Sequence, residues 1–125
     1  MIYGIGADLC SIRRVQNIKD LNKFANKILT SDEIEYLDTL DQKNSVNYLA
    51  KQFAAKEALS KALGTGLTGD VKLNLIEIDR DQSGKPYIKM NDHMKTLLSK
   101  IGVNSTFVSL ADDSDYAVAT VILER

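Results

Sequence analysis

The 125-residue sequence contains one cysteine, one histidine, one proline and no tryptophan. The lone cysteine, Cys10, excludes an internal disulfide and suits a reducing compartment. We expect it to be a small buried hydrophobic side chain. The lone histidine, His93, is expected at the surface, and nothing places it near a nucleophile. The sequence therefore suggests no serine–histidine–acid or cysteine–histidine catalytic set.

A strong net charge and a targeting segment are also lacking. The formal net charge is −1, so no global field draws the chain to nucleic acid or to a membrane. The first residues form no basic leader and reach Asp8 early, unlike a signal peptide or a membrane span. We therefore expect a cytoplasmic protein with neither a nucleic-acid nor a membrane partner.

The chain has enough apolar residues for one hydrophobic core. Its hydrophobic content is 44% over 125 residues, which supports one compact unit but not two. We expect residues 1–125 to form a single domain. Because a domain of this size buries limited surface, association with copies of itself would be a natural way to bury more.

One short segment is strongly basic although the whole chain is nearly neutral. Between residues 11 and 27, five lysine and arginine side chains stand against one aspartate: Arg13, Arg14, Lys19, Lys23 and Lys27 against Asp20. Such a segment is typical of a solvated helix face. It could equally meet an acidic partner. Composition leaves both interpretations open.

Hydrophobic periodicity predicts helices in the first half of the chain. After a strand over residues 1–9, Ser11 is a plausible N-cap for a short helix, and a second helix covers residues 21–28. Thr30 and Glu33 have the spacing of a capping box at the start of a third helix. The longest helix is expected over residues 45–63, and Gly64 is typical of helix termination.

The second half of the chain has the period of strands. A strand with a bulge is expected over residues 71–78, and a hairpin turn over 81–84 leads into a strand at 86–90. One further helix, through Met94 and Ile101, precedes two strands at 106–111 and 116–123. These elements indicate an α+β fold with a mostly antiparallel sheet packed with helices.

Glu57 is the most informative polar residue. A helical projection places it in an apolar stripe, beside Ala50, Phe53 and Ala54. An unpaired ionised carboxylate there would be costly, so it needs a cation, hydrogen-bond donors or a metal. An internal ion pair with Lys61, four residues on, would satisfy it as well as a functional site would.

Asp8 is the second candidate, at the end of a strand with two glycines. The missing side chains at Gly4 and Gly6 would let a backbone or a ligand approach closely. An exposed Asp8 that caps the next helix is equally compatible with the local sequence.

Two carboxylates without a cysteine or histidine cluster favour a hard, oxygen-preferring ion. Mg²⁺ is held in this way, by one or two carboxylates together with substrate phosphates. Lys61 would add positive charge for those phosphates, so Asp8, Glu57 and Lys61 together suit a phosphoryl-type transfer.

Longer motifs resemble a known family. The segment from Phe53 to Gly66, FAAKEALSKALGTG, resembles the central motif of the holo-acyl-carrier-protein synthases, the short bacterial class of phosphopantetheinyl transferases. The opening GIGADL with Arg13 and Arg14 resembles the first strand and basic helix of that family. The segments GKP at 84–86 and YAVA at 116–119 follow in the family's order. The resemblance covers essentially the whole chain.

The resemblance implies the 4′-phosphopantetheinyl transferase fold in a homotrimer whose active sites lie between subunits and bind coenzyme A and Mg²⁺. It implies that Asp8 and Glu57 coordinate the ion and that Lys61 contacts phosphate. It further implies that the basic helix with Arg13 and Arg14 receives an acyl carrier protein. It places four residues along the nucleotide pocket: Gly64, Ser83, Gly84 and Pro86.

The implied reaction is attack by a serine hydroxyl of the carrier protein on the β-phosphate of coenzyme A, which releases 3′,5′-ADP. The sequence departs from the family pattern at two positions. Asp112 stands where many members have histidine, so that histidine's role cannot be carried over. Gln52 stands where many have arginine, which would remove one phosphate contact.

Two other classes of function would use the same residues. A non-catalytic protein could bind coenzyme A or a carrier protein without turnover, although intact Asp8, Glu57 and Lys61 argue against it. A magnesium-dependent nucleotide hydrolase would use the same carboxylates with water as nucleophile, and would need no basic docking helix.

Overall fold

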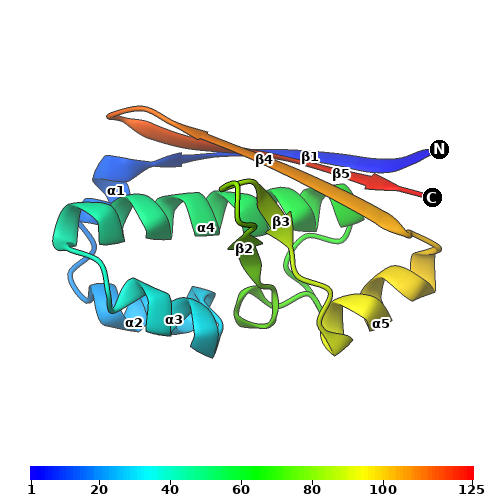
Figure 1. The fold of residues 1–125 in the computed structure, drawn as a ribbon, viewed down its shortest axis with the longest axis horizontal. Coiled ribbons are helices and arrows are strands. Elements are labelled where there is room, and N and C mark those ends of the chain that lie inside the picture. The colour runs from blue at the N-terminus through cyan, green and yellow to red at the C-terminus, as the bar shows by residue number, and fades with distance from the viewer.

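An antiparallel sheet packs against one long helix in this computed structural model, which describes residues 1–125 (Figure 1). Its three strands are β1 (Ile2–Ser11), β4 (Ser105–Asp112) and β5 (Tyr116–Glu124), in the order β1-β5-β4. The helix beneath the sheet is α4 (Gln42–Leu63), which packs on both β1 and β5. The α+β class and the antiparallel sheet are as the sequence predicts.

All five α-helices begin at a polar cap, whose side chain accepts a hydrogen bond from a backbone N–H of the first turn. The shorter helices are α1 (Ile12–Gln16), α2 (Leu21–Ile28), α3 (Ser31–Leu37) and α5 (Asp92–Ile101). Ser11 caps α1, and Thr30 forms the predicted capping box with Glu33. Asp41 caps α4, so this helix begins three residues before the predicted start.

A second, two-stranded sheet forms the predicted hairpin. It pairs β2 (Ile78–Arg80) with β3 (Pro86–Ile88). In the turn between them, Asp81 Oδ1 accepts hydrogen bonds from Ser83 Oγ, Ser83 N and Lys85 N. The hydrogen bond from the Ser83 side chain, followed by that from the Lys85 backbone, lowers the pKa of Asp81. The turn is therefore stabilised by an ionised carboxylate.

The prediction of a strand over residues 71–78 is wrong for most of that segment. The chain instead forms a 3-10 helix, η1 (Leu73–Leu75), and becomes a strand only at Ile78. The carbonyl of Leu73 accepts a hydrogen bond from the buried Lys56 ammonium at 3.1 Å. This segment thus directs a backbone acceptor to a side chain of α4 rather than to a neighbouring strand.

Strand β1 lies directly on the backbone of α4 because it carries glycines at the contact. A Cβ atom at Gly6 would lie 1.8 Å from the carbonyl oxygen of Ala58, and one at Gly4 would lie 2.0 Å from that of Ala62. Asp8 follows on the same face, because strand side chains alternate. The close approach therefore sets the Asp8 carboxylate beside the helix.

The hydrophobic core forms around α4 and is rich in small residues. Leu49, Ala50 and Ala54 of the helix are fully buried, as are Ala119 and Val121 of β5. Alanine at these positions allows the sheet to lie close to the helix.

None of the helices combines the length and the apolar character needed to cross a membrane.

Candidate active site

Asp8 and Lys61 are joined across the contact between β1 and α4. Lys61 Nζ donates hydrogen bonds to Asp8 Oδ1 at 3.0 Å and to the carbonyl oxygen of Ala7 at 3.1 Å. The Asp8 side chain is 17% exposed and that of Lys61 is 54% exposed. Asp8 does not cap α1, since Ser11 does so. The carboxylate is therefore available to a cation, and Lys61 now fills that role.

Glu57 lies one helical turn before Lys61 and is half-buried. Burial raises the pKa of its carboxyl, the negative charge of Asp8 raises it further, and the Lys61 ammonium opposes both. No ion pair joins Glu57 to Lys61, whose partner is Asp8. The internal Glu57–Lys61 pair that the sequence left open is thus not formed. The Asp8 carboxylate is therefore near enough for its charge to act on Glu57.

The donor set at this place fits a small, hard divalent cation. Asp8 and Glu57 offer only carboxylate oxygens, the ligand type that Mg²⁺ prefers. No group of three or more His, Cys, Asp or Glu side chains that could hold a metal ion is present. Two protein carboxylates match the protein's share of magnesium sites that substrate phosphates and water complete. The charges of Asp8 and Glu57 are mutually unfavourable, and Asp8 is already paired with the Lys61 ammonium. A bound cation would relieve the repulsion between the two carboxylates.

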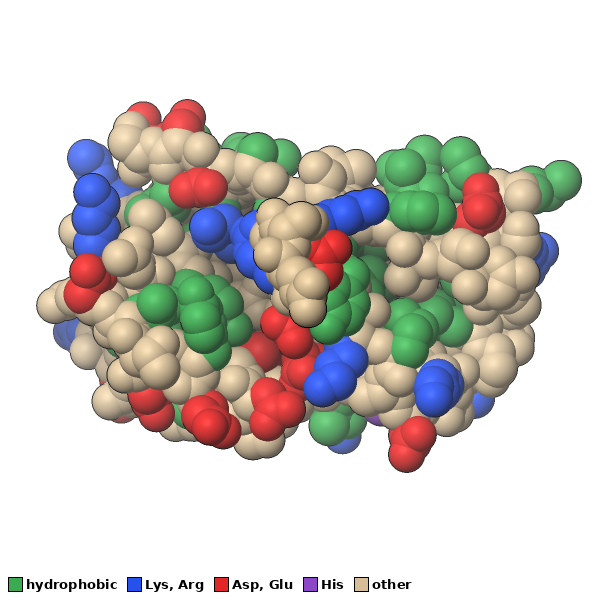
Figure 2. All heavy atoms as spheres, viewed as in Figure 1, with side chains coloured by type: hydrophobic (Ala, Val, Ile, Leu, Met, Phe, Trp, Pro, Cys, Tyr) green, Lys and Arg blue, Asp and Glu red, His purple; other side chains and the backbone are tan.

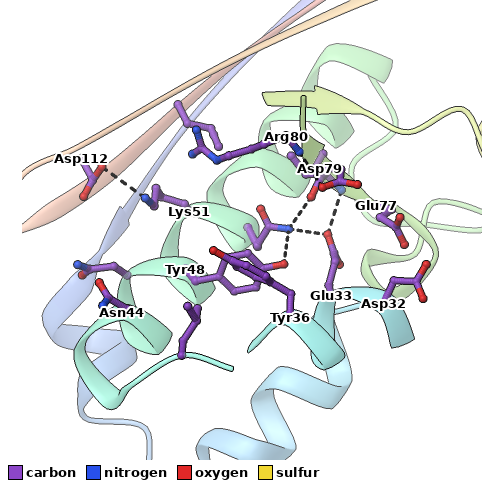
Figure 3. Close-up of a pocket in the computed structure, with 15 residues that line it drawn as sticks. Asp32, Glu33, Tyr36, Asn44, Tyr48, Lys51, Glu77, Asp79, Arg80 and Asp112 are labelled. Carbon is purple, nitrogen blue, oxygen red and sulfur yellow. Dashed lines mark hydrogen bonds and ion pairs between the residues drawn. The ribbon is translucent and has the colours of Figure 1, made fainter. Parts of the chain in front are cut away.

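A second region, on the other side of α4, is a cavity of about 880 Å³. It is lined by residues of α3, α4, β2 and β4, among which Lys51 and Arg80 are the cationic side chains. Figure 3 shows Lys51 and Asp112 pointing toward each other, with Asp32 and Glu77 at the opposite end of the group. The Lys51 ammonium lies 3.7 Å from the Asp112 carboxylate.

The wall of this cavity contains a buried polar network that sequence reasoning missed. The Glu33 carboxylate, 3% exposed, accepts hydrogen bonds from Lys56 Nζ, Gln52 Nε2 and the backbone N–H of Ile78. Lys56 is fully buried, and burial lowers the pKa of its ammonium although Glu33 opposes this shift. The network ties α3 and β2 to α4.

A local signal for part of this network exists. Gln52 and Lys56 are four residues apart and so lie on one face of the helix, where both are polar among alanines. The sequence identified Glu33 only as a capping residue. In the structure Gln52 is 3% exposed, and its amide is committed to Glu33 and to the carbonyl oxygen of Ile78.

No hydrogen bond or ion pair joins the other candidate residues to the two carboxylates. Gly64 ends α4 with a φ of 82°, three residues after Lys61. Ser83 and Gly84 lie in the exposed β2–β3 turn, and Pro86 begins β3. Arg80 Nη1 donates a hydrogen bond to the carbonyl oxygen of Gly84 at 2.8 Å, which links this turn to the cavity.

Arg13 and Arg14 are exposed on α1, as the sequence predicts for a basic face. None of the five cations of residues 11–27 forms an ion pair within the chain. Arg14 also borders a hollow of about 200 Å³ whose lining is mostly apolar and includes Ile18, Phe24 and Phe53. Uncompensated positive charge thus stands beside an apolar groove.

His93 differs in part from the surface position expected for it. It lies on α5 and is only partly exposed, and its Nε2 atom is buried without a hydrogen-bond partner.

The two candidate regions lie at opposite edges of the sheet. Asp8 belongs to β1 at one edge, and the cavity is bounded by β4 at the other edge, with β5 between them. Figure 2 shows the face with the β2–β3 hairpin at its middle, where basic side chains lie beside the hairpin and acidic ones below it. Strand β5 and helix α4 thus lie between the two regions of one chain.

Comparisons with known proteins identify the same family over nearly the full length of this chain. Residues 4–121 match the family model of the 4′-phosphopantetheinyl transferase superfamily. The chain is 41% identical over 125 residues to a holo-[acyl-carrier-protein] synthase of Vibrio atlanticus, covering 98% of each chain. It superposes on the Neisseria meningitidis holo-[acyl-carrier-protein] synthase with a TM-score of 0.92 and 39% identity, covering 100% of both chains. A Bacillus anthracis holo-(acyl-carrier-protein) synthase in complex with CoA (3′,5′-ADP) has a TM-score of 0.84 and 34% identity, covering 98% of this chain and 96% of that one.

Proposed function

Because this chain belongs to the 4′-phosphopantetheinyl transferase superfamily, we infer that it carries out the holo-[acyl-carrier-protein] synthase reaction. It transfers the 4′-phosphopantetheine group from coenzyme A to a serine of an apo-acyl carrier protein. A phosphodiester bond forms between the serine oxygen and the β-phosphorus of coenzyme A. The bond from that phosphorus to the α-phosphate oxygen breaks, and 3′,5′-ADP leaves. We treat residues 1–125 as one catalytic domain.

The observation that carries this proposal is the meeting of Asp8, Glu57 and Lys61, from two elements far apart in the chain. We propose that Asp8 and Glu57 hold Mg²⁺, which would neutralise the pyrophosphate of coenzyme A and orient it. Lys61 exchanges its Asp8 partner for a phosphate oxygen, because the ion then compensates the Asp8 charge. The protein thus supplies charge compensation at the place where negative charge is transferred.

The nucleotide half of coenzyme A fits the cavity of about 880 Å³ at the β4 edge. Since the two regions lie at opposite edges of one chain, one coenzyme A molecule would contact the carboxylates of one protomer and the cavity of another. Gly64 extends the phosphate end of this site, and the turn with Ser83, Gly84 and Pro86 extends the nucleotide end.

The outer face of the sheet supports assembly into a homotrimer. It exposes Ile5, Leu9 and Phe107 by 51–61%, together with Tyr116 and Val118. Figure 2 shows hydrophobic side chains along the edge of the molecule where the sheet lies. A contiguous apolar face is characteristic of a protein–protein interface, and copies of this chain are the proposed partner.

The basic segment is proposed to receive the acyl carrier protein. Arg13 and Arg14 are exposed and unpaired, and Arg14 stands beside an apolar groove bordered by Phe24 and Phe53. An acidic, amphipathic helix would meet positive charge and an apolar surface at once. This role rests on the proposed carrier-protein substrate, and with it we propose a function in fatty acid biosynthesis in the cytoplasm.

A mass measurement on the carrier protein tests the proposal. Purified protein, apo-acyl carrier protein, coenzyme A and Mg²⁺ are incubated, and the intact carrier protein is weighed by mass spectrometry. We expect the mass of one phosphopantetheine arm to be added, and the reaction to stop when EDTA removes the metal.

Two other outcomes would overturn it. An unmodified carrier protein with coenzyme A intact would identify a non-catalytic binding protein. Consumption of coenzyme A without modification of the carrier protein would identify a hydrolase.

A further inference from the structure

Lys61 neutralises Asp8 within the chain itself. Its ammonium lies 3.0 Å from Asp8 Oδ1 and 3.1 Å from the carbonyl oxygen of Ala7, and it donates a hydrogen bond to each. The two acceptors belong to adjacent residues of β1, so together they hold the ammonium beside the carboxylate. Lys61 therefore engages one of the two carboxylates that are assigned above to the metal ion.

The charge of Lys61 acts on Glu57 as well. Burial raises the pKa of the Glu57 carboxyl, the negative charge of Asp8 raises it further, and the Lys61 ammonium opposes both. One internal cation thus partly compensates both carboxylates. A divalent ion bound by these carboxylates would be repelled by the ammonium. Lys61 is therefore a competitor of the ion.

The ion pair can open at little cost in stability. The Lys61 side chain is 54% exposed, and pairs with an exposed partner contribute little to the folded state. A lysine ammonium sits on a flexible four-carbon stem, so it can move to another acceptor while the helix stays in place. A pyrophosphate oxygen would be such an acceptor, with a stronger negative charge nearby than a backbone carbonyl offers.

We propose that the Asp8–Lys61 ion pair is an inhibitory contact that makes divalent-cation binding and coenzyme A binding depend on each other. Lys61 weakens the affinity of Asp8 for the cation, and Asp8 weakens the affinity of Lys61 for the pyrophosphate. When both ligands bind, Lys61 moves to a phosphate oxygen and Asp8 is free for the ion. This inference rests on the proposed function and adds a form of regulation to it, since neither ligand alone binds well.

The dependence is reciprocal. If coenzyme A strengthens cation binding by a certain factor, the cation must strengthen coenzyme A binding by the same factor, because both orders of binding lead to one complex. Direct attraction between Mg²⁺ and a pyrophosphate contributes to this coupling factor in any site. The contribution of Lys61 is the part of the factor that is lost when its charge is removed.

Calorimetry with MgCl₂ alone tests the competition. Lys61→Met removes the charge and should bind Mg²⁺ about tenfold more tightly than the wild-type protein, since one repelling charge is gone. Lys61→Arg keeps the charge and should bind Mg²⁺ as weakly as the wild type. Lys95→Met removes an exposed lysine of α5 and changes the net charge equally. It is the matched control and should leave the affinity for Mg²⁺ unchanged.

Repeating the MgCl₂ titration with saturating coenzyme A measures the coupling. Lys61→Met should lower the coupling factor by about tenfold, and titration of coenzyme A with and without Mg²⁺ should give the same factor. Asp8→Asn releases Lys61 from its partner. It should therefore bind coenzyme A more tightly than the wild type when EDTA has removed divalent ions.

Equal or weaker Mg²⁺ binding by Lys61→Met, including no detectable binding to either protein, would overturn the inference. An unchanged coupling factor would overturn it too. The titration with MgCl₂ alone uses neither coenzyme A nor a carrier protein. Tighter Mg²⁺ binding by Lys61→Met without transfer to a carrier protein would keep the inhibitory contact and reject the proposed function. Transfer by the wild type with an unchanged Mg²⁺ affinity in Lys61→Met would do the reverse.

Discussion

Two lysines of the same helix segment have different surroundings and different roles. Lys56 is fully buried and bound to Glu33 and two carbonyl oxygens, so burial lowers the pKa of its ammonium. Lys61 is half-exposed, and its partner is Asp8. A buried lysine held by three acceptors cannot leave them without a large cost in free energy. Lys61 can exchange its partner, and this is why it, rather than Lys56, suits phosphate contact.

Replacement of either carboxylate beside Lys61 should remove turnover and spare the fold. We expect Asp8→Ala and Glu57→Ala each to lower kcat/KM by about 100-fold or more, since each removes charge from the proposed magnesium–pyrophosphate site. Stability should change little, because the Asp8–Lys61 pair is partly exposed. Transfer kinetics and thermal unfolding measure the two effects.

Glu35→Ala, which removes an exposed carboxylate of α3, is the control and should keep normal kinetics. Normal activity in either purified site variant would rule out the metal assignment.

At the scale of elements, the contact between β1 and α4 determines where Asp8 lies. The strand approaches the helix at Gly4 and Gly6, opposite the carbonyl oxygens of Ala62 and Ala58. A longer separation would move Asp8 away from Glu57 and Lys61. The glycines thus contribute to the site although neither has a side chain.

The substitution Gly6→Ala should therefore disturb both stability and activity. The added methyl group would meet backbone atoms, which cannot turn aside as a side chain can. We expect a loss of about 3 kcal/mol of unfolding free energy, at the upper end of overpacking effects, and reduced transfer activity in the protein that still folds. Urea unfolding followed by circular dichroism provides the measurement.

Ser99→Thr adds one methyl group at an exposed position of α5 and should cost only a few tenths of a kcal/mol. A Gly6→Ala protein as stable as the wild type would show that β1 has room to move.

Helix α1 carries the charge proposed to guide the carrier protein. Reversal of both arginines, Arg13→Glu with Arg14→Glu, should raise the KM for an acidic carrier protein sharply, because like charges would then face each other. The KM for coenzyme A should change much less. Added salt should weaken the wild-type dependence on the carrier protein, since exposed charges are screened over about 8–10 Å near physiological ionic strength.

Kinetics with each substrate varied in turn, at two salt concentrations, measure these effects. If the double variant lost coenzyme A binding and kept normal carrier-protein kinetics, α1 would be a phosphate site instead.

At the scale of the whole molecule, one face of the sheet packs on α4 and the other is open. Ile5 and Leu9 of β1 are 61% and 59% exposed, and Phe107 of β4 is 51% exposed. Apolar side chains on both faces of a three-stranded sheet are unusual for a chain that stays alone in water. The open face and the proposed division of the site between two sheet edges both favour assembly.

We therefore expect a trimer in solution. Multi-angle light scattering should give three times the chain mass of 13.9 kDa. Phe107→Glu should dissociate the trimer and lower activity, because it places charge in an apolar interface. Leu75→Glu, at a similarly exposed apolar position outside the sheet, should do neither. A fully active wild-type preparation with a monomeric mass would contradict active sites shared between subunits.

Local sequence patterns were sufficient to predict the features that depend on neighbouring residues. The caps at Ser11 and Thr30 and the helix end at Gly64 rest on hydrogen bonds within about four residues, so local patterns were sufficient. Glu57 was also identified locally, by its polarity within an apolar stripe. Asp8 was identified by its place at the end of a strand with two glycines, and Lys61 by its spacing of four residues from Glu57.

Which distant side chains meet could not be predicted in this way and became known from the three-dimensional structure. Lys61 had a possible partner four residues away in Glu57 but bonds to Asp8, 53 residues distant. Glu33 joins Lys56 and Ile78, and the carbonyl of Leu73 turns to Lys56 instead of extending a strand. Local propensity cannot predict such pairs, because their energy is gained only after the chain has brought separate elements together.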